Sequence, residues 1–496
     1  MGQCTERQRN RPRLLFVFRA LPFYCLAGML SLQAQTLTQT RQSTATRPST
    51  QPSTQSTTVG GPPISGEQTL PGAARLSAPP AQLTLSTAID LALTNNLATL
   101  LAQEQKRAAA GVTEQARSTL LPNISGAAYQ ANVTLNLAAL GFQPGTFPGI
   151  STAFIGPFNN FDARASLVQK VLDLSAIRNY QSGHAGERVA DYQERLAREQ
   201  VSEATALTYL ETLRTDRNVA AAQANVELAV SLFRLAQDQH NAGVATGVDV
   251  TRAETRLAQE RVGLAQATTA SEQARLNLQR VIGVPLGSPL VLIDPLRFVD
   301  EPLPATDTAV AQALAARNEV LISTEQLKML QLERKAIRGE LLPSLEFVAD
   351  YGVSGITPTN LALPTRRVAI QLNVPIFNGG LTLGRMTVAT SREHQAELQL
   401  SSIRGQVEED VRLALSALRT TVERVRAADD ALRLAQRELE MARDRFSAGV
   451  ADNLEVVTAQ TSLANARAAQ VEALAVYNAA RLNLASALGR AQTFRW

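Results

Sequence analysis

The stretch Arg-Ser-Thr-Leu-Leu-Pro at residues 117–122 returns as Arg-Gly-Glu-Leu-Leu-Pro at residues 338–343, a constant offset of 221. Further along the chain the offset becomes 206, where Ala-Gly-Val at residues 242–244 recurs at residues 448–450. Two copies of about 200 residues are too long to be the units of a solenoid. Each copy is therefore expected to be a complete structural half, and pseudo-symmetry is expected to relate the two halves.

The first 34 residues have the parts of a secretory signal peptide. Five arginines precede an apolar core at Leu21–Leu32, and Ala34 offers a small residue before a polar tail. A single membrane anchor is the alternative, but a spanning helix needs about 20 apolar residues and this core is shorter. Both cysteines, Cys4 and Cys25, fall in this segment, and the bulky residues before Cys25 argue against lipidation.

The charge of the chain also belongs to this segment. Five arginines and one glutamate in it account for the whole formal charge of +4, so a chain that begins near Gln35 is neutral. A neutral chain offers no basic patch for nucleic acid, and we expect no such partner. No other run is expected to reach the length of a membrane-spanning helix.

Composition and the repeat divide the rest of the chain. Thr, Ser, Gln, Pro and Gly dominate after the signal, and such a segment cannot bury enough surface to offset its ordering entropy. Prolines are frequent in the segment that links the two halves, which is typical of a linker. The expected domains are a signal peptide 1–34, a disordered leader 35–82, a first repeat 83–283 with a β-hairpin at 123–172, a linker 284–305, a second repeat 306–490 with a β-hairpin at 344–377, and a tail 491–496.

Each half contains long helical stretches. From Ile403 to Val425 the apolar residues follow one another at spacings of three and four, which is a helical stripe. A helix over most of residues 378–450 would be about 90 Å long, more than a globular core needs. Small residues then repeat in heptads after each bend, so two antiparallel helical hairpins are expected, with Gly243 and Gly449 at the bends.

Four shorter segments alternate apolar and polar residues, as strands with two different faces do. Strands of about 10 residues with one apolar face suit a transmembrane barrel, whereas a soluble sheet does not explain hairpins at the far ends of such long helices. Four strands cannot close a barrel alone, and an open edge in lipid is forbidden, so several chains are expected to complete it. The residues predicted to face lipid are Tyr129, Val133, Phe161, Phe347, Ile370 and Leu372.

With these elements in place, the chain resembles the TolC-type outer-membrane efflux protein family. The resemblance rests on the repeated Leu-Leu-Pro before each hairpin, the run Val374–Gly380, the two bends, and Ala480–Leu484 near the end. It covers residues 83–490. No single motif is specific, but the order and spacing of the set, found twice, are.

The resemblance implies a mainly helical fold with a transmembrane β part. Tandem-duplicated helical hairpins would form an α-barrel in the periplasm, and three chains with four strands each would form a 12-stranded barrel in the outer membrane. The function implied is the exit duct of a tripartite efflux or type I secretion system. The implied partners are two further copies, a periplasmic adaptor (membrane fusion) protein, an inner-membrane pump of RND, ABC or MFS type, and outer-membrane lipid.

The resemblance also places the helical bends at a narrow, pump-facing entrance. A carboxylate stands six residues beyond each bend glycine. The alternative for these acids is a helix cap, because Asp452 with Glu455 resembles a capping box and acids in a first turn favour the helix dipole. The expected site residues are Asp249, Glu455 and Phe446 at the entrance constriction, and Gly243, Val244, Gly449 and Val450 at the adaptor-contacting tips.

Nothing in the sequence predicts an enzyme, a cofactor or a metal site. The three histidines are isolated, and the glycines at 243 and 247 lack the lysine of a phosphate-binding loop. A structural trimeric coiled-coil surface protein is the alternative function. It would share the heptads but would need no hairpins with a lipid-facing side.

Overall fold

The structure is a computed structural model that describes residues 76–78, 80, 82–141 and 153–495. The chain divides into two units, Met1–Gly66 and Glu67–Trp496, and every described residue belongs to the second. The expected signal peptide 1–34 and most of the expected leader 35–82 therefore lie outside the described residues.

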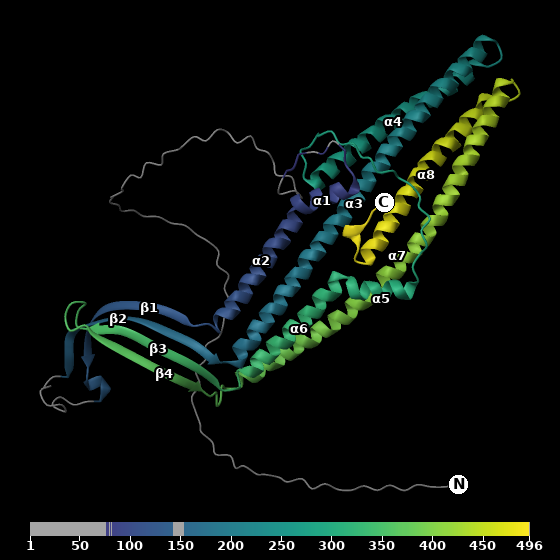
Figure 1. Cartoon of the computed structure of the whole chain (residues 1–496). Coiled ribbons are helices and arrows are strands. Elements are labelled where there is room, and N and C mark those ends of the chain that lie inside the picture. The colour runs from purple at the N-terminus through teal and green to yellow at the C-terminus, as the bar shows by residue number, and fades with distance from the viewer. Residues whose placement is uncertain (1–75, 79, 81, 142–152, 496) are drawn as a thin grey trace, which may run out of the picture. The chain divides into compact units, whose positions relative to one another are not determined.

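The second unit repeats one order of elements: two helices, a β-hairpin, and a long helix followed by a shorter one (Figure 1). Two short 3₁₀ turns, Ala138–Leu140 and Ala491–Thr493, complete the description. The first half consists of α1 (Leu85–Asn95), α2 (Leu97–Ser118), β1 (Asn123–Asn136), β2 (Phe154–Leu172), α3 (Leu174–Asn241) and α4 (Gly247–Ile282). The second half consists of α5 (Thr306–Ala316), α6 (Asn318–Gly339), β3 (Ser344–Gly355), β4 (Leu363–Asn373), α7 (Leu381–Ser447) and α8 (Asn453–Ala487).

The strands form one antiparallel sheet in the order β1-β2-β3-β4. The pairing of β2 with β3, from Phe161 opposite Gly355 to Leu172 opposite Leu345, joins the two halves. At one end of the sheet, each strand is joined to one helix: β1 to α2, β2 to α3, β3 to α6 and β4 to α7. Neighbouring helices contact one another in this same order. The sheet and the layer of helices are therefore one continuous surface.

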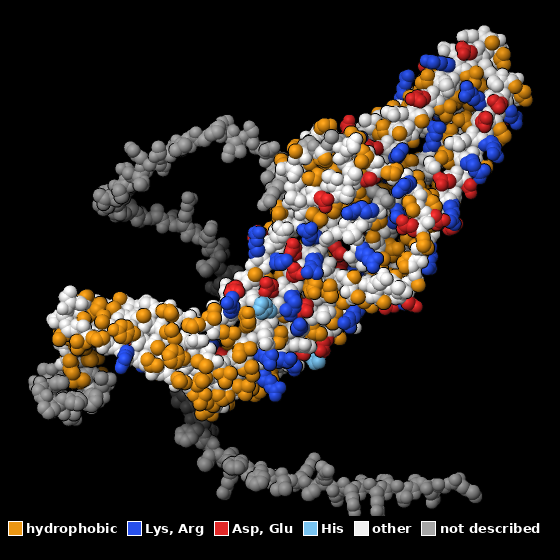
Figure 2. Space-filling view, in the orientation of Figure 1, with side chains coloured by type: hydrophobic (Ala, Val, Ile, Leu, Met, Phe, Trp, Pro, Cys, Tyr) orange, Lys and Arg blue, Asp and Glu red, His pale blue; other side chains and the backbone are white. Residues whose placement is uncertain are grey.

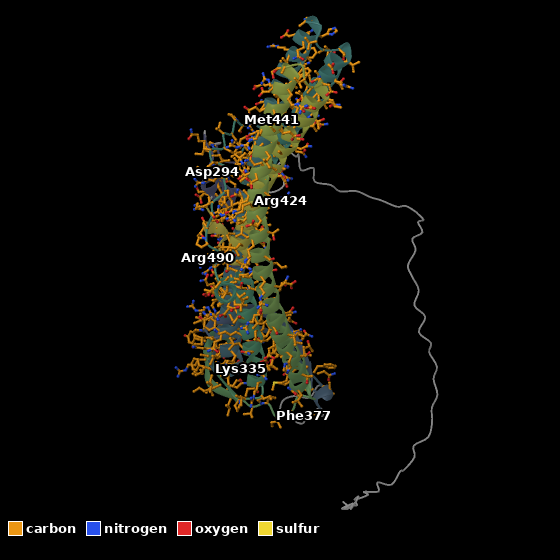
Figure 3. The ribbon with its side chains drawn as sticks, turned by 90° about the vertical axis from the view of Figure 1, so that its right-hand side faces the viewer. Asp294, Lys335, Phe377, Arg424, Met441 and Arg490 are labelled. Atoms are coloured by element: carbon orange, nitrogen blue, oxygen red, sulfur yellow. The ribbon has the colours of Figure 1, made fainter. Side chains whose placement is uncertain are left out.

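The long helices, α3 with 68 residues and α7 with 67, run from the sheet to the bends. The predicted stripe on α7 is confirmed, because Val407, Val411 and Leu415 are buried. Phe377 lies near the strand end of these helices, and Met441 lies toward the bends (Figure 3). Contrary to expectation, one 18-residue window of α3 is apolar enough to cross a membrane by length and composition, and only 17% of it is buried. One such helix is weak evidence of a span.

The middle of the unit holds the main core, where the linker between the halves packs against the helices. The Tyr209 hydroxyl on α3 lies 2.9 Å from the Leu83 carbonyl oxygen and 2.9 Å from Asp294 Oδ2. The same Asp294 oxygen accepts the Leu85 N–H at 2.7 Å, at the start of α1. One buried tyrosine thus joins the first helix, the long helix and the linker.

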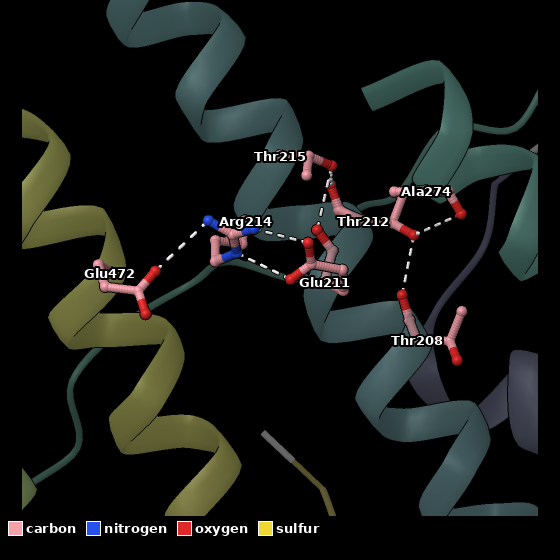
Figure 4. A network of polar contacts seen from close by, with 7 residues as sticks. All are labelled: Thr208, Glu211, Thr212, Arg214, Thr215, Ala274 and Glu472. Carbon is pink, nitrogen blue, oxygen red and sulfur yellow. Dashed lines mark hydrogen bonds and ion pairs between the residues drawn. The ribbon is translucent and has the colours of Figure 1, made fainter. Parts of the chain in front are cut away.

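Polar contacts also tie α3 to its neighbours above this core (Figure 4). Arg214 pairs with Glu211 on its own helix at 2.6 Å and reaches Glu472 on α8 at 3.4 Å. The buried Thr212 hydroxyl lies 2.9 Å from the Thr208 carbonyl oxygen, so it is satisfied within the helix. The pair of Arg214 with Glu472 connects the helical hairpin of the first half to that of the second.

Substituting Tyr209→Phe should lower the free energy of unfolding by about 1–3 kcal/mol, because buried acceptors lose a donor. Circular dichroism during urea unfolding would measure the loss. Tyr351→Phe is the matched control, because Tyr351 is 65% exposed and should tolerate the change. Equal unfolding midpoints for the two variants would contradict this role for Tyr209.

Candidate functional site

The sheet has one apolar and one charged face, and its register assigns each residue to one of them. Residues directly opposite each other in an antiparallel pair have their side chains on the same face. Phe347 is opposite Gln169 on β2 and opposite Ile370 on β4, while Leu345 is opposite Leu372. The same alternation places these residues on the mainly apolar face: Ile124, Ala128, Phe161, Ala163, Leu167, Leu345, Phe347, Ala349, Tyr351, Val353, Val368, Ile370 and Leu372. The polar residues Gln130, Gln169 and Arg366 share it.

This apolar face is open in the single chain. Ile124 is 73% exposed, Ile370 72% and Leu372 63%. Hydrophobic side chains cover the strands and their junction with the helices, whereas charged side chains are concentrated over the helices (Figure 2). At that junction Ile376 and Phe377 are 94% and 88% exposed. An exposed apolar surface of this kind marks contact with lipid or with another chain.

The opposite face carries a network of four charges across three strands. Arg164 Nε donates to Asp162 at 2.6 Å, and Arg164 Nη1 lies 3.3 Å from Asp350. Asp350 also pairs with Arg367 on β4 at 3.1 Å. Gly352 lies opposite Arg164, and a Cβ there would be 2.5 Å from the Arg164 Cβ. Because Gly352 has no side chain, the Arg164 side chain can lie over β3 and reach Asp350, two residues away on the same strand.

Sequence reasoning did not identify this network. The sequence does show charged residues at alternate positions of these strands. Which of them lie next to one another depends on the strand register, which the sequence does not reveal. The aspartate side chains are 7% and 11% exposed, and the arginine side chains above them are 37% and 69% exposed. The face therefore presents guanidinium groups outward, with the carboxylates beneath them.

Two of the six predicted lipid-facing residues lie on this charged face. Tyr129 is opposite Asp162, and Val133 is opposite Phe158, whereas Phe161 is opposite Gln130. The prediction of one shared face is therefore wrong for Tyr129 and Val133. In the second part of β1 the apolar residues alternate with Gln130, Asn132 and Thr134, so the pattern of this strand alone predicted the opposite face from the one that its pairing with β2 gives.

At the other end of the helices, both bends have the same geometry. Gly243 and Gly449 have φ of 74° and 71°, which a residue with a side chain rarely adopts. The N–H of each glycine and of the following valine donates back to carbonyls of the last helical turn, as in a Schellman motif. Val244 and Val450 are left 62% and 72% exposed.

Hydrogen bonds also join the two bends. The Asn453 amide donates to the Asp249 carbonyl at 2.8 Å, and the Gln239 amide donates to the Phe446 carbonyl at 3.0 Å. The Phe446 side chain is only 4% exposed and packs in a core with Leu232 and Val456. In the single chain Phe446 is therefore a core residue of the bends, and its place at an entrance constriction stays a prediction.

The two predicted entrance carboxylates have different environments. Asp249 Oδ2 accepts the Thr246 N–H at 3.0 Å and the Thr246 hydroxyl at 2.6 Å, which completes a capping box. These bonds, with Arg252 nearby, hold the pKa of the Asp249 carboxyl below its ordinary value. Glu455 is 47% exposed at its side chain and lies 3.3 Å from Arg445. The capping alternative thus describes Asp249, and Glu455 remains the accessible carboxylate.

A family model described as outer membrane efflux protein matches residues 83–284 and 308–490. The alkaline protease secretion protein AprF of Pseudomonas aeruginosa is 27% identical over 316 residues, which are 62% of this chain and 65% of AprF. Outer membrane protein TolC of Escherichia coli is 24% identical over 67% of this chain and 70% of TolC. The chain thus spans less than two thirds of the length of AprF.

Solved structures share the fold. The Campylobacter jejuni outer membrane channel CmeC has a TM-score of 0.70 at 20% identity, over 83% of this chain and 87% of CmeC. The Neisseria gonorrhoeae channel MtrE has a TM-score of 0.67 at 19% identity, over 85% of this chain and 94% of MtrE. The expected fold class and family resemblance are confirmed. The chain belongs to the outer membrane efflux protein family.

Proposed function

We propose that this protein is the outer-membrane exit duct of a tripartite efflux or type I secretion system. Three copies would form one channel that carries substrates from an inner-membrane pump across the periplasm and the outer membrane. Relatives named for secretion, such as AprF, and for efflux, such as the toluene efflux pump protein TtgC of Pseudomonas putida, support this proposal. They give no support to the alternative of a structural surface protein.

The observation that carries the proposal is a sheet with an exposed apolar face and two unpaired edges. No described strand pairs with the outer edge of β1 or of β4. Lipid accepts a sheet only when it is closed, and four strands are too few to close. β4 runs toward the helices and β1 runs away from them, so β4 of one copy can pair antiparallel with β1 of the next.

In the closed assembly the apolar face would meet lipid and the charged face would line the lumen. Phe161, Phe347, Ile370 and Leu372 would then be lipid-facing. Tyr129 would face the lumen, beside the charged network. The helices that follow each strand would continue the cylinder into the periplasm, because their order matches the order of the strands.

The bends would form the periplasmic entrance. Val244 and Val450, held in place by Gly243 and Gly449, present an apolar surface that suits a periplasmic adaptor protein. Glu455 is the carboxylate that we propose for the entrance, because its side chain is accessible, whereas the Asp249 carboxylate caps the N-terminus of α4. Three copies would bring three such carboxylates together, and a narrow opening concentrates their field and attracts cations.

Leu372→Arg should sharply reduce the trimer in outer membranes, because an arginine facing lipid costs about 2–4 kcal/mol near the bilayer midplane. Gln371→Arg is the matched control: it is the neighbouring residue on the charged face, opposite Glu346. Semi-native gels of membrane fractions and conductance in planar bilayers would measure both variants. Equal tolerance of the two arginines would refute the assignment of faces.

Glu455→Gln should weaken the cation preference of the channel in planar bilayers, whereas Asp249→Asn should leave it unchanged. Asp249→Asn should instead lower thermal stability, by about 0.3–1 kcal/mol for a carboxylate at a helix N-terminus. Unchanged selectivity in Glu455→Gln trimers would exclude the entrance role.

The stability effect of Asp249 should depend on pH. Its pKa is lowered by folding, so its contribution is complete above the ordinary value of about 3.9 and is lost as the pH falls through the lower folded value. Unfolding midpoints at about pH 7 and about pH 3 should therefore differ more for the unmodified protein than for Asp249→Asn. The opposite order would contradict this account.

A further inference from the structure

The two halves differ in the pairing of one arginine, and the first half provides the comparison. Arg275 on α4 binds the carboxylate of Asp216 on α3 at 3.0 Å. The Ser271 hydroxyl, one turn before Arg275, donates to the same carboxylate at 2.6 Å. In the first half, therefore, a carboxylate from the long helix satisfies the arginine of the shorter one.

At the offset of 206 the same positions in the second half are Arg481, Val422 and Tyr477. This offset also aligns the buried positions of the long helices, since Val201 corresponds to Val407 and Tyr209 to Leu415. The arginine is present in both halves, but the position of the carboxylate in the first half is the aliphatic Val422 in the second.

Arg481 is buried and only partly paired, whereas the side chain of Arg275 is 45% exposed. Its side chain is 10% exposed, and its Nη2 lies 2.9 Å from Glu301, whose side chain is 62% exposed. Its Nη1 is buried and has no hydrogen-bond partner among the described residues. The guanidinium lies over the rings of Tyr477 and Phe494, at 5.9 Å and 5.7 Å from their centroids. A buried charged donor without an acceptor is costly.

A cleft of about 350 Å³ opens beside this arginine. Aliphatic side chains from α7 and α8 line one side, and the linker prolines line another. Arg490, at the side of the long helices between the levels of Lys335 and Met441 (Figure 3), and Arg495 add positive charge, while Glu301 is the one acid in the lining. The apolar residues that the argument uses are Leu418, Val422, Leu484 and Leu488.

We propose that this cleft binds a small organic acid, with its carboxylate on Nη1 of Arg481, so that the ligand supplies the kind of acceptor that Asp216 supplies to Arg275 in the first half. The apolar body of the ligand would lie against Val422 and the leucines. Binding would give Nη1 a charged acceptor, and a charge-assisted bond of this kind is among the strongest available to an arginine. The volume is at the lower end of the range of about 300–1,000 Å³ for ligand pockets, which limits the ligand to a small molecule. The inference does not depend on the proposed transport function.

Phenylacetate and its neutral isostere phenylacetamide test the proposal on the full chain in lipid nanodiscs, by isothermal titration calorimetry. Phenylacetate should bind saturably, and phenylacetamide should bind at least about tenfold more weakly, because only the carboxylate offers a charged acceptor. Arg481→Gln should weaken phenylacetate binding to the same extent. Arg275→Gln, the same change at the paired arginine of the first half, should leave it unchanged.

Val422→Asp supplies the missing carboxylate from within the chain. This variant should bind no phenylacetate and should have a higher thermal unfolding midpoint than the unmodified protein. The proposal is overturned if the unmodified protein shows no saturable binding, if the acid and the amide bind equally, or if Val422→Asp still binds phenylacetate. A lower midpoint for Val422→Asp would also overturn it, because it would show that this position cannot hold the carboxylate.

Discussion

The backbone groups along the outer edges of β1 and β4 are the constraint on which the rest of this chain depends. Within the described residues no strand pairs with either edge, yet one face of the sheet is apolar and exposed. In hydrocarbon an unpaired N–H or C=O group costs several kcal/mol, so an open sheet cannot remain there. The unpaired edges are the reason that we propose further copies of the chain to complete the sheet. A closed sheet then dictates the helical part, because each strand is continuous with one helix.

The duplication explains why the chain has four strands, and why the first and the last of them run in opposite directions. Each half contributes one antiparallel hairpin, and the pairing of β2 with β3 continues the alternation across the join. The outer strands consequently run in opposite directions, which is the condition for antiparallel pairing between identical copies. The bends repeat as well, because a glycine with positive φ follows each long helix, after 68 residues in α3 and 67 in α7.

The sequence was sufficient for those features that depend on local pattern. Spacings of three and four predicted α7, and glycine after a helical stripe predicted both bends, since each signal reports the geometry of its own segment. Features that depend on register were not accessible. Tyr129 was assigned to the wrong face because its own strand alternates apolar and polar residues, whereas the register places it opposite Asp162. The network around Arg164 forms only when three strands align. Phe446 could be matched to a family position, but its burial depends on contact between two hairpins distant in sequence.

The two halves keep the same pattern of burial with different chemistry at the buried positions. Thr205 and Thr212 in α3 are buried and contact carbonyl oxygens of their own helix, whereas the positions 206 residues later are Val411 and Leu418. Such an exchange costs little, because the hydroxyl and its bond are lost together. The exchange of Asp216 for Val422 is different, because its partner arginine remained. Arg481 pairs instead with Glu301 of the linker through Nη2, which leaves Nη1 as the donor for which we propose a bound carboxylate.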